Sequence, residues 1–211
     1  MKRLTLILLS SFFAFVSAYA ANIPVSSYSM LNGAAGSYDY RDFTYVPCNG
    51  VCDVTGAPLS GGTGKLTDGV LPSTDWDQEG YYTQWVGWDI YQGGTNPTAT
   101  FFFGSTANVR SVTIWLDNTA GRGMEFLPES VTIAGQNFLI PPDYVDGPRA
   151  YTFDVNITSD NVPVQFFQTP GYNWIMVGEV SFNDAVPEPA TLSLAGAGLL
   201  AAWWKRRGAR S

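Results

Sequence analysis

Carboxylates supply most of the side chains in this chain that could do chemistry. The 211 residues include 18 Asp and Glu and no histidine. Without histidine, the Ser-His-Asp and Cys-His arrangements are excluded, and so is nearly all zinc catalysis. What remains is acid–base chemistry by paired carboxylates, lysine chemistry, and the binding of hard cations such as calcium through oxygen ligands.

The densest acidic group is Asp75, Asp77 and Glu79 in the segment Thr74–Glu79. These residues alternate, so in an extended segment they would share one side, as a second cation site or a carboxylate pair. A glycoside hydrolase needs two carboxyl groups roughly 5–10 Å apart around a sugar. A solvated acidic loop is the plainer interpretation, and the sequence leaves these alternatives open.

The two cysteines, Cys48 and Cys52, are separated by Asn-Gly-Val. In an oxidising compartment we expect them to form a disulfide across a tight Asn-Gly turn. A metal site here would need further Cys or His ligands, which the chain lacks. The pair therefore predicts one stapled loop.

The N-terminus has the three parts of a secretory signal. Lys2 and Arg3 are charged, Leu4 to Val16 is apolar, and Ala18-Tyr19-Ala20 is a small-x-small site. This order predicts a signal peptide over residues 1–20, removed by signal peptidase after Ala20.

The C-terminus has a second three-part pattern. Val186-Pro187-Glu188-Pro189 precedes an apolar segment over residues 190–204 and a basic tail over residues 205–211. A helix needs roughly 20 apolar residues to cross about 30 Å of hydrocarbon, so this segment predicts a short, transient membrane anchor. The basic tail would stay in the cytoplasm.

Between the signals, residues 21–185 form the expected mature domain. It keeps five of the eleven Lys and Arg but seventeen of the eighteen acids, so its net charge is near −12. Such a surface repels phosphate backbones, so we expect no nucleic-acid partner. Cations suit it better, although excess acid also serves solubility.

The elements that must position these groups are β-strands. Short runs with alternating apolar residues are separated by Gly, Pro, Asn and Asp, and no stretch has convincing helical periodicity. We expect an all-β fold of two sheets packed face to face, with one or two strands and long loops over residues 22–64. The clearest strands are Thr98–Phe103, Val109–Leu116, Ser130–Ile133, Ala150–Val155, Val162–Phe167 and Trp174–Phe182.

The C-terminal pattern over residues 186–211 resembles the PEP-CTERM sorting signal of Gram-negative bacteria. The resemblance implies export across the inner membrane and recognition by an exosortase. It also implies processing near Pro187-Glu188-Pro189 and delivery to the cell surface or its polysaccharide matrix. An ordinary tail anchor is the alternative.

A second resemblance covers about residues 65–182. Leu66-Thr67-Asp68-Gly69, Trp85-Val86-Gly87-Trp88, Ser130-Val131-Thr132-Ile133 and Val177-Gly178-Glu179-Val180 are similar, in this order, to the galactose-binding-like jelly rolls of the discoidin or coagulation factor 5/8 C-type family. The family implies an eight-stranded β-sandwich with its binding loops clustered at one end.

The same resemblance implies one structural calcium ion. The ligands matched by position are Asp68, Glu179, the hydroxyl of Ser73 or Thr74, and the carbonyls of Lys65 and Val70. A hard cation would relieve the repulsion between two carboxylates brought together from distant segments. The chain departs from the commoner family loop because Val70, and not an acid, follows Gly69.

Aromatic residues make up 15% of the chain, and sugars stack on exposed aromatic faces. Tyr172 and Trp174, after the Pro170-Gly171 turn, are the candidate sugar-binding aromatics, and Arg122 is a candidate polar partner. We therefore predict an exported, non-catalytic module that binds an exopolysaccharide. The alternatives are a purely structural matrix or adhesion protein and a carboxylate-dependent glycoside hydrolase or lyase.

Overall fold

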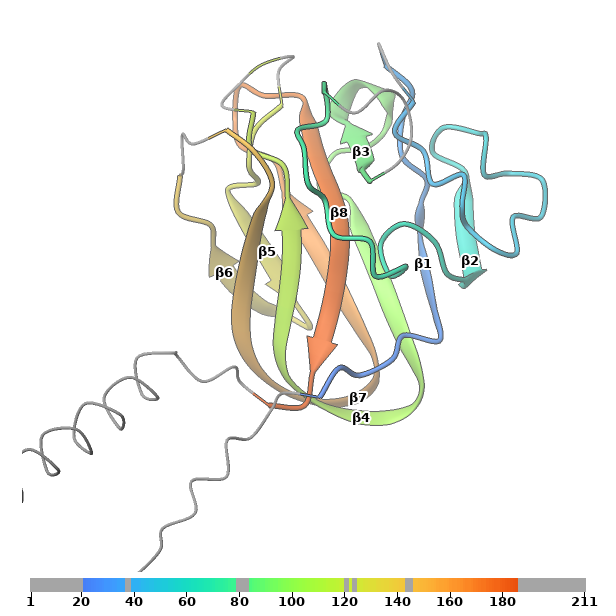
Figure 1. Ribbon diagram of the computed structural model, residues 1–211, viewed down its shortest axis with the longest axis vertical. Coiled ribbons are helices and arrows are strands. Elements are labelled where there is room, and N and C mark those ends of the chain that lie inside the picture. The colour runs from blue at the N-terminus through green and yellow to red at the C-terminus, as the bar shows by residue number, and fades with distance from the viewer. Residues whose placement is uncertain are drawn as a thin grey trace, which may run out of the picture. The chain divides into compact units, whose positions relative to one another are not determined.

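The structure of this protein is a computed structural model that describes residues 21–36, 39–78, 84–119, 122, 125–142 and 146–185. Both predicted signals, residues 1–20 and 186–211, lie outside them. The described part is almost entirely β-structure (Figure 1). The strands are β1 Ser27–Leu31, β2 Pro58–Gly62, β3 Val86–Asp89, β4 Thr98–Leu116, β5 Ser130–Ile133, β6 Gln136–Leu139, β7 Arg149–Phe167 and β8 Trp174–Asn183, and one 3-10 turn, η1, spans Ile90–Gln92. Within this part of the chain no helix is long and apolar enough to cross a membrane.

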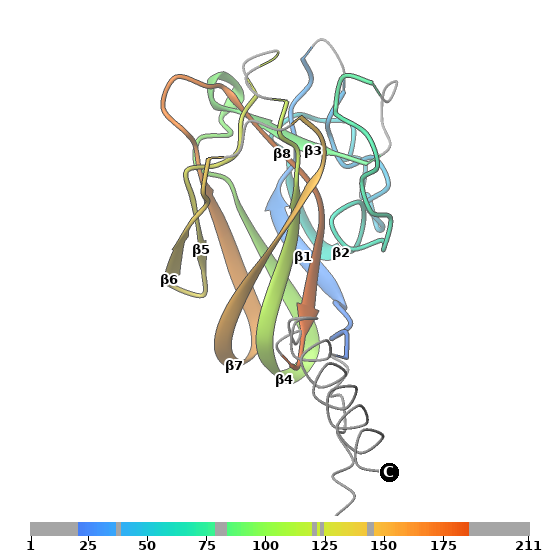
Figure 2. The ribbon, with the colours of Figure 1, turned by 60° about the vertical axis from the view of Figure 1, so that its left-hand side comes forward.

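Two long strands, β4 and β7, take part in both layers of the fold. One layer has the order β2-β1-β4-β7-β5-β6, and the other is formed by β3, β8 and the remaining halves of β4 and β7. The two long strands are paired along their length and curve together from one layer into the other, as Figures 1 and 2 show. Their register shifts between Phe102 and Ala107 and again between Val109 and Ser111, and such irregularities help a sheet to bend.

Aromatic rings join the two layers. Trp88 of β3 stacks on Phe166 of β7 with ring centroids 5.9 Å apart, and Phe182 of β8 lies 5.1 Å from Phe101 of β4. Side-chain alternation in β7 follows the expected period, with Phe153, Val155 and Ile157 buried between exposed polar neighbours. The core therefore lies between the sheets.

The predicted all-β, two-layer sandwich is confirmed, but β3 and β6 were not among the predicted strands, and two strands are longer than predicted. The predicted strands 98–103 and 109–116 are halves of β4, and 150–155 and 162–167 are halves of β7. At the bend the register passes from the pair Phe102 and Asn161 to the pair Ala107 and Ser159, so each strand continues beyond it, although the polar residues there resemble a loop in the sequence. Residues 22–64 contain two strands and long loops, as expected.

The sandwich has two distinct ends. At the loop end, contacts join the loops that follow β4, precede β7 and precede β8: Gly147 N donates to Asn118 O, and Glu125 bridges to Trp174. At the terminal end, opposite to it, β4 and β7 bend and the described chain begins and finishes. There Ile23 N donates to Phe182 O over 2.7 Å. The predicted sorting tail continues from the terminal end.

Candidate functional site

Arg122 forms ion pairs that connect three loops at the loop end. Its Nη2 lies 2.6 Å from Asp75 Oδ2 and 3.4 Å from Asp146 Oδ2, and its Nη1 lies 2.6 Å from Asp77 Oδ2. The hydrogen bond to Asp75 and the surrounding carboxylates raise the pKa of Arg122. Asp75 and Asp77, predicted to share one side of an extended segment, therefore do converge, and they converge on a cation. Glu79, the third acid of that segment, lies outside the described residues.

Two carboxyl groups are fully buried at this end. Asp117, directly after β4, accepts from Trp76 N at 3.1 Å and from Asn118 N at 2.9 Å. Glu125 Oε2 accepts from Thr119 N at 2.9 Å and from Thr119 Oγ1 at 2.6 Å, whereas Glu125 Oε1 has no partner.

Burial is the main reason why both acids titrate abnormally. It raises the pKa of Asp117 to about 7, and the negative charge of Asp75 adds to the effect. It raises the pKa of Glu125 well above its ordinary value, with Asp117 as the next cause. Both carboxyl groups therefore keep their proton to a higher pH than an exposed acid does.

The structure brings the predicted sugar-binding residues to the same end. Phe126 N donates to Trp174 O at 3.5 Å, which places Tyr172 and Trp174 beside the loop that carries Arg122. Both aromatic residues are half-buried and already packed. Tyr172 stacks on Phe126 with centroids 4.6 Å apart, and Trp174 meets Tyr40 edge to face at 5.4 Å.

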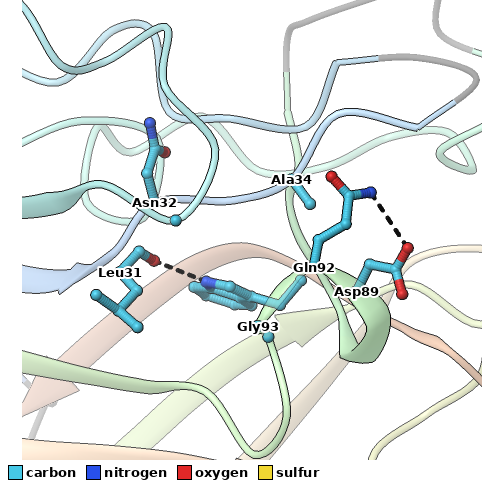
Figure 3. A pocket seen from close by; sticks show the side chains of 9 residues that line it. Leu31, Asn32, Ala34, Asp89, Gln92 and Gly93 are labelled. Atoms are coloured by element: carbon cyan, nitrogen blue, oxygen red, sulfur yellow. Dashed lines mark hydrogen bonds between the residues drawn. The ribbon is translucent and has the colours of Figure 1, made fainter.

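The most exposed large aromatic of the described chain is Tyr91, on η1 at the loop end, with 78% of its surface exposed. A pocket of about 10 Å³ lies beside it (Figure 3), which has room for about one water molecule. Asp89 Oδ1 accepts from Tyr91 N, and Gln92 Nε2 donates to Asp89 Oδ2 and to Ala35 O. Asp89 therefore caps η1, the turn that carries the exposed Tyr91.

The predicted calcium ligands Asp68 and Glu179 are brought together along β8. Glu179 Oε2 accepts from Gly69 N at 3.2 Å, and Asp68 Oδ1 accepts from Val70 N at 2.8 Å. Burial raises the pKa of Glu179 to about 7, and the charge of Asp68 raises it further. Burial also raises the pKa of Asp68. The pair is chemically suited to a cation.

The other predicted calcium ligands, hydroxyl and carbonyl groups, lie between Lys65 and Thr74. Ser73 N donates to Gln84 Oε1, and the buried hydroxyl of Thr74 has no partner. Across the described ranges, no three His, Cys, Asp or Glu side chains are grouped as a metal site. A calcium ion here would therefore depend on backbone and hydroxyl oxygens.

The side chain of Lys65 has an unexpected place. It is buried, and its Nζ donates to Arg41 O at 2.7 Å and to Trp85 O at 3.3 Å. Burial lowers its pKa to about 8. Lys65 N also donates to Asp42, which accepts the Tyr28 hydroxyl. This buried polar network was missed by sequence reasoning.

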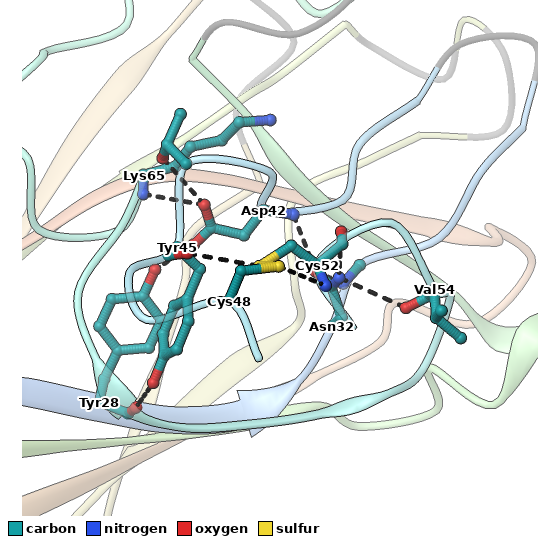
Figure 4. The surroundings of a disulfide bond; sticks show 10 residues. Tyr28, Asn32, Asp42, Tyr45, Cys48, Cys52, Val54 and Lys65 are labelled. Atoms are coloured by element: carbon teal, nitrogen blue, oxygen red, sulfur yellow. Dashed lines mark hydrogen bonds between the residues drawn. A yellow bond between two sulfur atoms is a disulfide. The ribbon is translucent and has the colours of Figure 1, made fainter. Parts of the chain in front are cut away.

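The predicted disulfide between Cys48 and Cys52 is confirmed, and its surroundings are shown in Figure 4. Asn32 Nδ2 donates to Cys52 O at 2.8 Å, and Asn32 Oδ1 accepts from Asp42 N at 2.8 Å. The stapled loop is thus fastened to the end of β1 and to the buried Asp42 network. Its role is to hold the long loop between β1 and β2.

An open groove of about 390 Å³ lies at the terminal end. Its lining is mainly hydroxyl groups and backbone, from Ser26, Ser27, Gly104, Ser105 and Thr106, with Phe102 and Asp160. It contains none of the predicted ligand residues. Its lining residues include one carboxylate, that of Asp160, and no Lys or Arg, whereas the loop end has Arg122.

Comparison with known proteins supports the resemblance found at the C-terminus. A family model described as the PEP-CTERM protein-sorting motif matches residues 185–207, which confirms the resemblance of the C-terminal pattern. The motif implies export and sorting by an exosortase. No curated protein matches the chain.

Several solved structures have a similar arrangement of strands. The family 32 carbohydrate-binding module of NanJ from C. perfringens, in complex with galactose, is 15% identical with a TM-score of 0.33, over 56% of this chain and 82% of that one. CpGH89CBM32-4 of Clostridium perfringens, in complex with GlcNAc-α-1,4-galactose, is 12% identical with a TM-score of 0.40, over 79% and 96%. The Streptococcus pneumoniae β-galactosidase BgaA is 9% identical with a TM-score of 0.44, over 78% and 98%. The two modules are of the predicted fold family, but the similarity is distant, and we infer nothing about ligands from it.

Proposed function

We propose that this protein is an exported module that binds a polysaccharide at its loop end and does not catalyse a reaction. The observation that carries the proposal is the gathering, on loops held by a rigid sandwich, of Arg122 with three carboxylates and of half-buried Tyr172 and Trp174. Sugars need hydrogen-bonding groups for their hydroxyls and apolar faces for their rings, and this end supplies both.

The orientation of the chain supports the same use. The sorting tail begins after Ala185 at the terminal end, so the loop end is the part of the sandwich farthest from the point of attachment. We propose that the apolar segment over residues 190–204 holds the precursor in the membrane until an exosortase processes it near Pro187-Glu188-Pro189. The module then belongs to the cell surface or its matrix.

The buried acids favour binding over catalysis. Asp117 and Glu125 are the carboxyl pair whose pKa values are most perturbed, but neither side chain is exposed to solvent. A glycoside hydrolase needs its two carboxyl groups on either side of the sugar. Asp117 and Glu125 are bonded to backbone and hydroxyl groups of their own loops instead.

We also propose one structural calcium ion at Asp68 and Glu179. The remaining oxygens would come from the hydroxyl of Ser73 or Thr74 and from the carbonyls of Lys65 and Val70. The ion would join the segment before β3 to β8. Its support is the raised pKa of two adjacent carboxyl groups, which a cation would offset.

A glycan array probed with the processed protein tests the function. We expect retention of at least one polysaccharide, and loss of that retention in Tyr172→Ala and Trp174→Ala variants that still fold. The array should include the polysaccharide of the producing bacterium. Failure to bind any glycan would overturn the proposal and favour a purely structural matrix or adhesion protein, and cleavage of the bound glycan would identify an enzyme.

A further inference from the structure

The loop end has more hydrogen-bond acceptors than donors. Buried side-chain oxygens without a hydrogen-bond partner at this end include Asp77 Oδ1, Glu125 Oε1 and Gln168 Oε1, besides the hydroxyl of Thr74. Gln168 belongs to the same end, because its Nε2 donates to Trp174 O at 3.1 Å. Ionised carboxylate and amide oxygens only accept, so Asp77 Oδ1 and Gln168 Oε1 call for a donor, whereas burial raises the pKa of Glu125 and favours its protonated form, which can itself donate.

The charges are unbalanced in the same sense. One guanidinium, that of Arg122, is shared by Asp75, Asp77 and Asp146. The side chains of Asp77 and Asp146 are 25% and 54% exposed, so a ligand can approach both.

We propose that the loop end selects glycans that carry protonated amino groups over glycans that carry carboxylates. A protonated amino sugar is the ligand chemistry that matches both observations. Its ammonium group has three donors, no acceptor and one positive charge. A uronate polymer brings acceptors and negative charge to a surface that already has both in excess. The inference rests on the proposed sugar-binding function and names the class of sugar.

Two oligosaccharides with one backbone isolate the charge. A chitosan hexasaccharide has free amino groups, whereas the chitin hexasaccharide has the same linkages with every amine acetylated and neutral. An oligogalacturonate of similar length supplies the anionic case. Calorimetric titration of the processed protein with each, at a pH where the sugar amine is protonated, compares the three directly.

We expect the chitosan oligosaccharide to bind about tenfold more tightly than its acetylated counterpart, since a charge-assisted hydrogen bond is worth more than a neutral one. The preference should fall with added salt and vanish at a pH where the amine is neutral. Oligogalacturonate should bind most weakly. Asp77→Asn and Asp146→Asn should each reduce the preference without changing the binding of chitin.

Asp160→Asn is the matched control, because it removes one exposed carboxylate at the terminal end. It should leave the preference intact. An equal loss in this control would mean that net charge, and not the loop end, attracts the amine, and the inference would be wrong. Equal affinity for chitosan and chitin, or tighter binding of oligogalacturonate, would also overturn the inference while leaving sugar binding in place. If none of these three oligosaccharides binds but another glycan on the array does, the inference alone is overturned. If no glycan binds at all, the proposed function is overturned.

Discussion

At the loop end, side-chain charges join segments that share little backbone pairing, whereas at the terminal end backbone hydrogen bonds and aromatic packing do the joining. Arg122 connects its own loop to the segment with Asp75 and Asp77 and to Asp146. Around Phe182, by contrast, the rings of Phe101 and Phe103 both lie 5.1 Å away, and Phe182 O accepts from Ile23 N.

This difference separates the tasks of the two ends. Backbone pairing and ring packing are hard to alter without loss of the fold, because every residue of the strand depends on them. Contacts between loop side chains can change while the sandwich stays intact, which is why binding residues are commonly found on loops. The predictions below test the separation.

The largest expected effect is at the terminal end. Phe182 is fully buried, and Phe182→Ala should lower the free energy of unfolding by about 3–5 kcal/mol, because it leaves a cavity between the layers. Tyr172 at the loop end is only half-buried, so Tyr172→Ala should lower the free energy of unfolding by roughly 1–2 kcal/mol. Urea unfolding measures both. If the Tyr172 variant loses as much as the Phe182 variant, the loop end belongs to the main core and the comparison fails.

A smaller effect is expected along β8, between the two ends. The pKa of Glu179 is raised from its ordinary value of 4.5 to about 7, so without calcium the folded state holds this proton longer than the unfolded state. Stability should therefore fall as pH rises through that window. Calcium should remove this loss, and chelation at about pH 8 should lower the melting temperature by about 2–4 °C, equivalent to about 1 kcal/mol.

Two variants sharpen the calcium test. Glu179→Gln should abolish the response of the melting temperature to chelation. Glu129→Gln, which changes an exposed glutamate directly before β5, should leave that response unchanged. Melting curves that are identical with calcium and with a chelator would eliminate the proposed ion.

At the loop end, Glu125→Gln should make stability less dependent on pH. Burial raises the pKa of Glu125, so its contribution to stability is present at low pH and lost as pH rises toward the folded-state value. Removing the ionisable group should stabilise the protein at about pH 8 by roughly 1 kcal/mol and change little at about pH 4. Thermal melts across this range provide the measurement. A variant as pH-dependent as the native protein would contradict the assignment.

The smallest effect is expected at the chain start. Ala21 N lies 2.9 Å from Asp184 Oδ1 at an exposed position, and cleavage after Ala20 would make this nitrogen a charged amine. Asp184→Asn should lower the melting temperature by at most about 2 °C, since an exposed ion pair contributes about 0–1 kcal/mol. Arg122→Gln should lower it more, because the side chain of its partner Asp75 is only 6% exposed. The reverse order would contradict the view that charges matter more at the loop end.

Local patterns were enough to predict β5, β8, the halves of β4 and β7, and the disulfide. Residues 130–133 and 174–182 alternate or are continuously apolar, and Cys48 and Cys52 are close enough in sequence to pair. The continuity of β4 and β7 was not predictable, because the polar residues at their bends resemble loop residues and pairing resumes only beyond a register shift. The burial of Lys65 was also missed, since its partners are carbonyls of Arg41 and Trp85.

The candidate site was only partly predictable. Asp68 and Glu179, 111 residues apart, were paired by the resemblance to a known family, and the structure does bring them together. Arg122 was predicted as a polar partner for a sugar, but its ion pairs with three carboxylates were not predicted. Asp117 and Glu125 carried one weak signal, the position of Asp117 directly after an alternating strand.

By itself, the sequence determined where this protein is sent and what kind of fold it has. Signal segments are recognised from their local composition, and strands from the alternation of apolar residues. Neither requires knowledge of contacts between distant residues. Only the tertiary structure decided which charges meet. Arg122 faces Asp75, Asp77 and Asp146 because the loop after β4, the loop before β7 and the segment before β3 meet at one end, and electrostatic energy depends on that proximity.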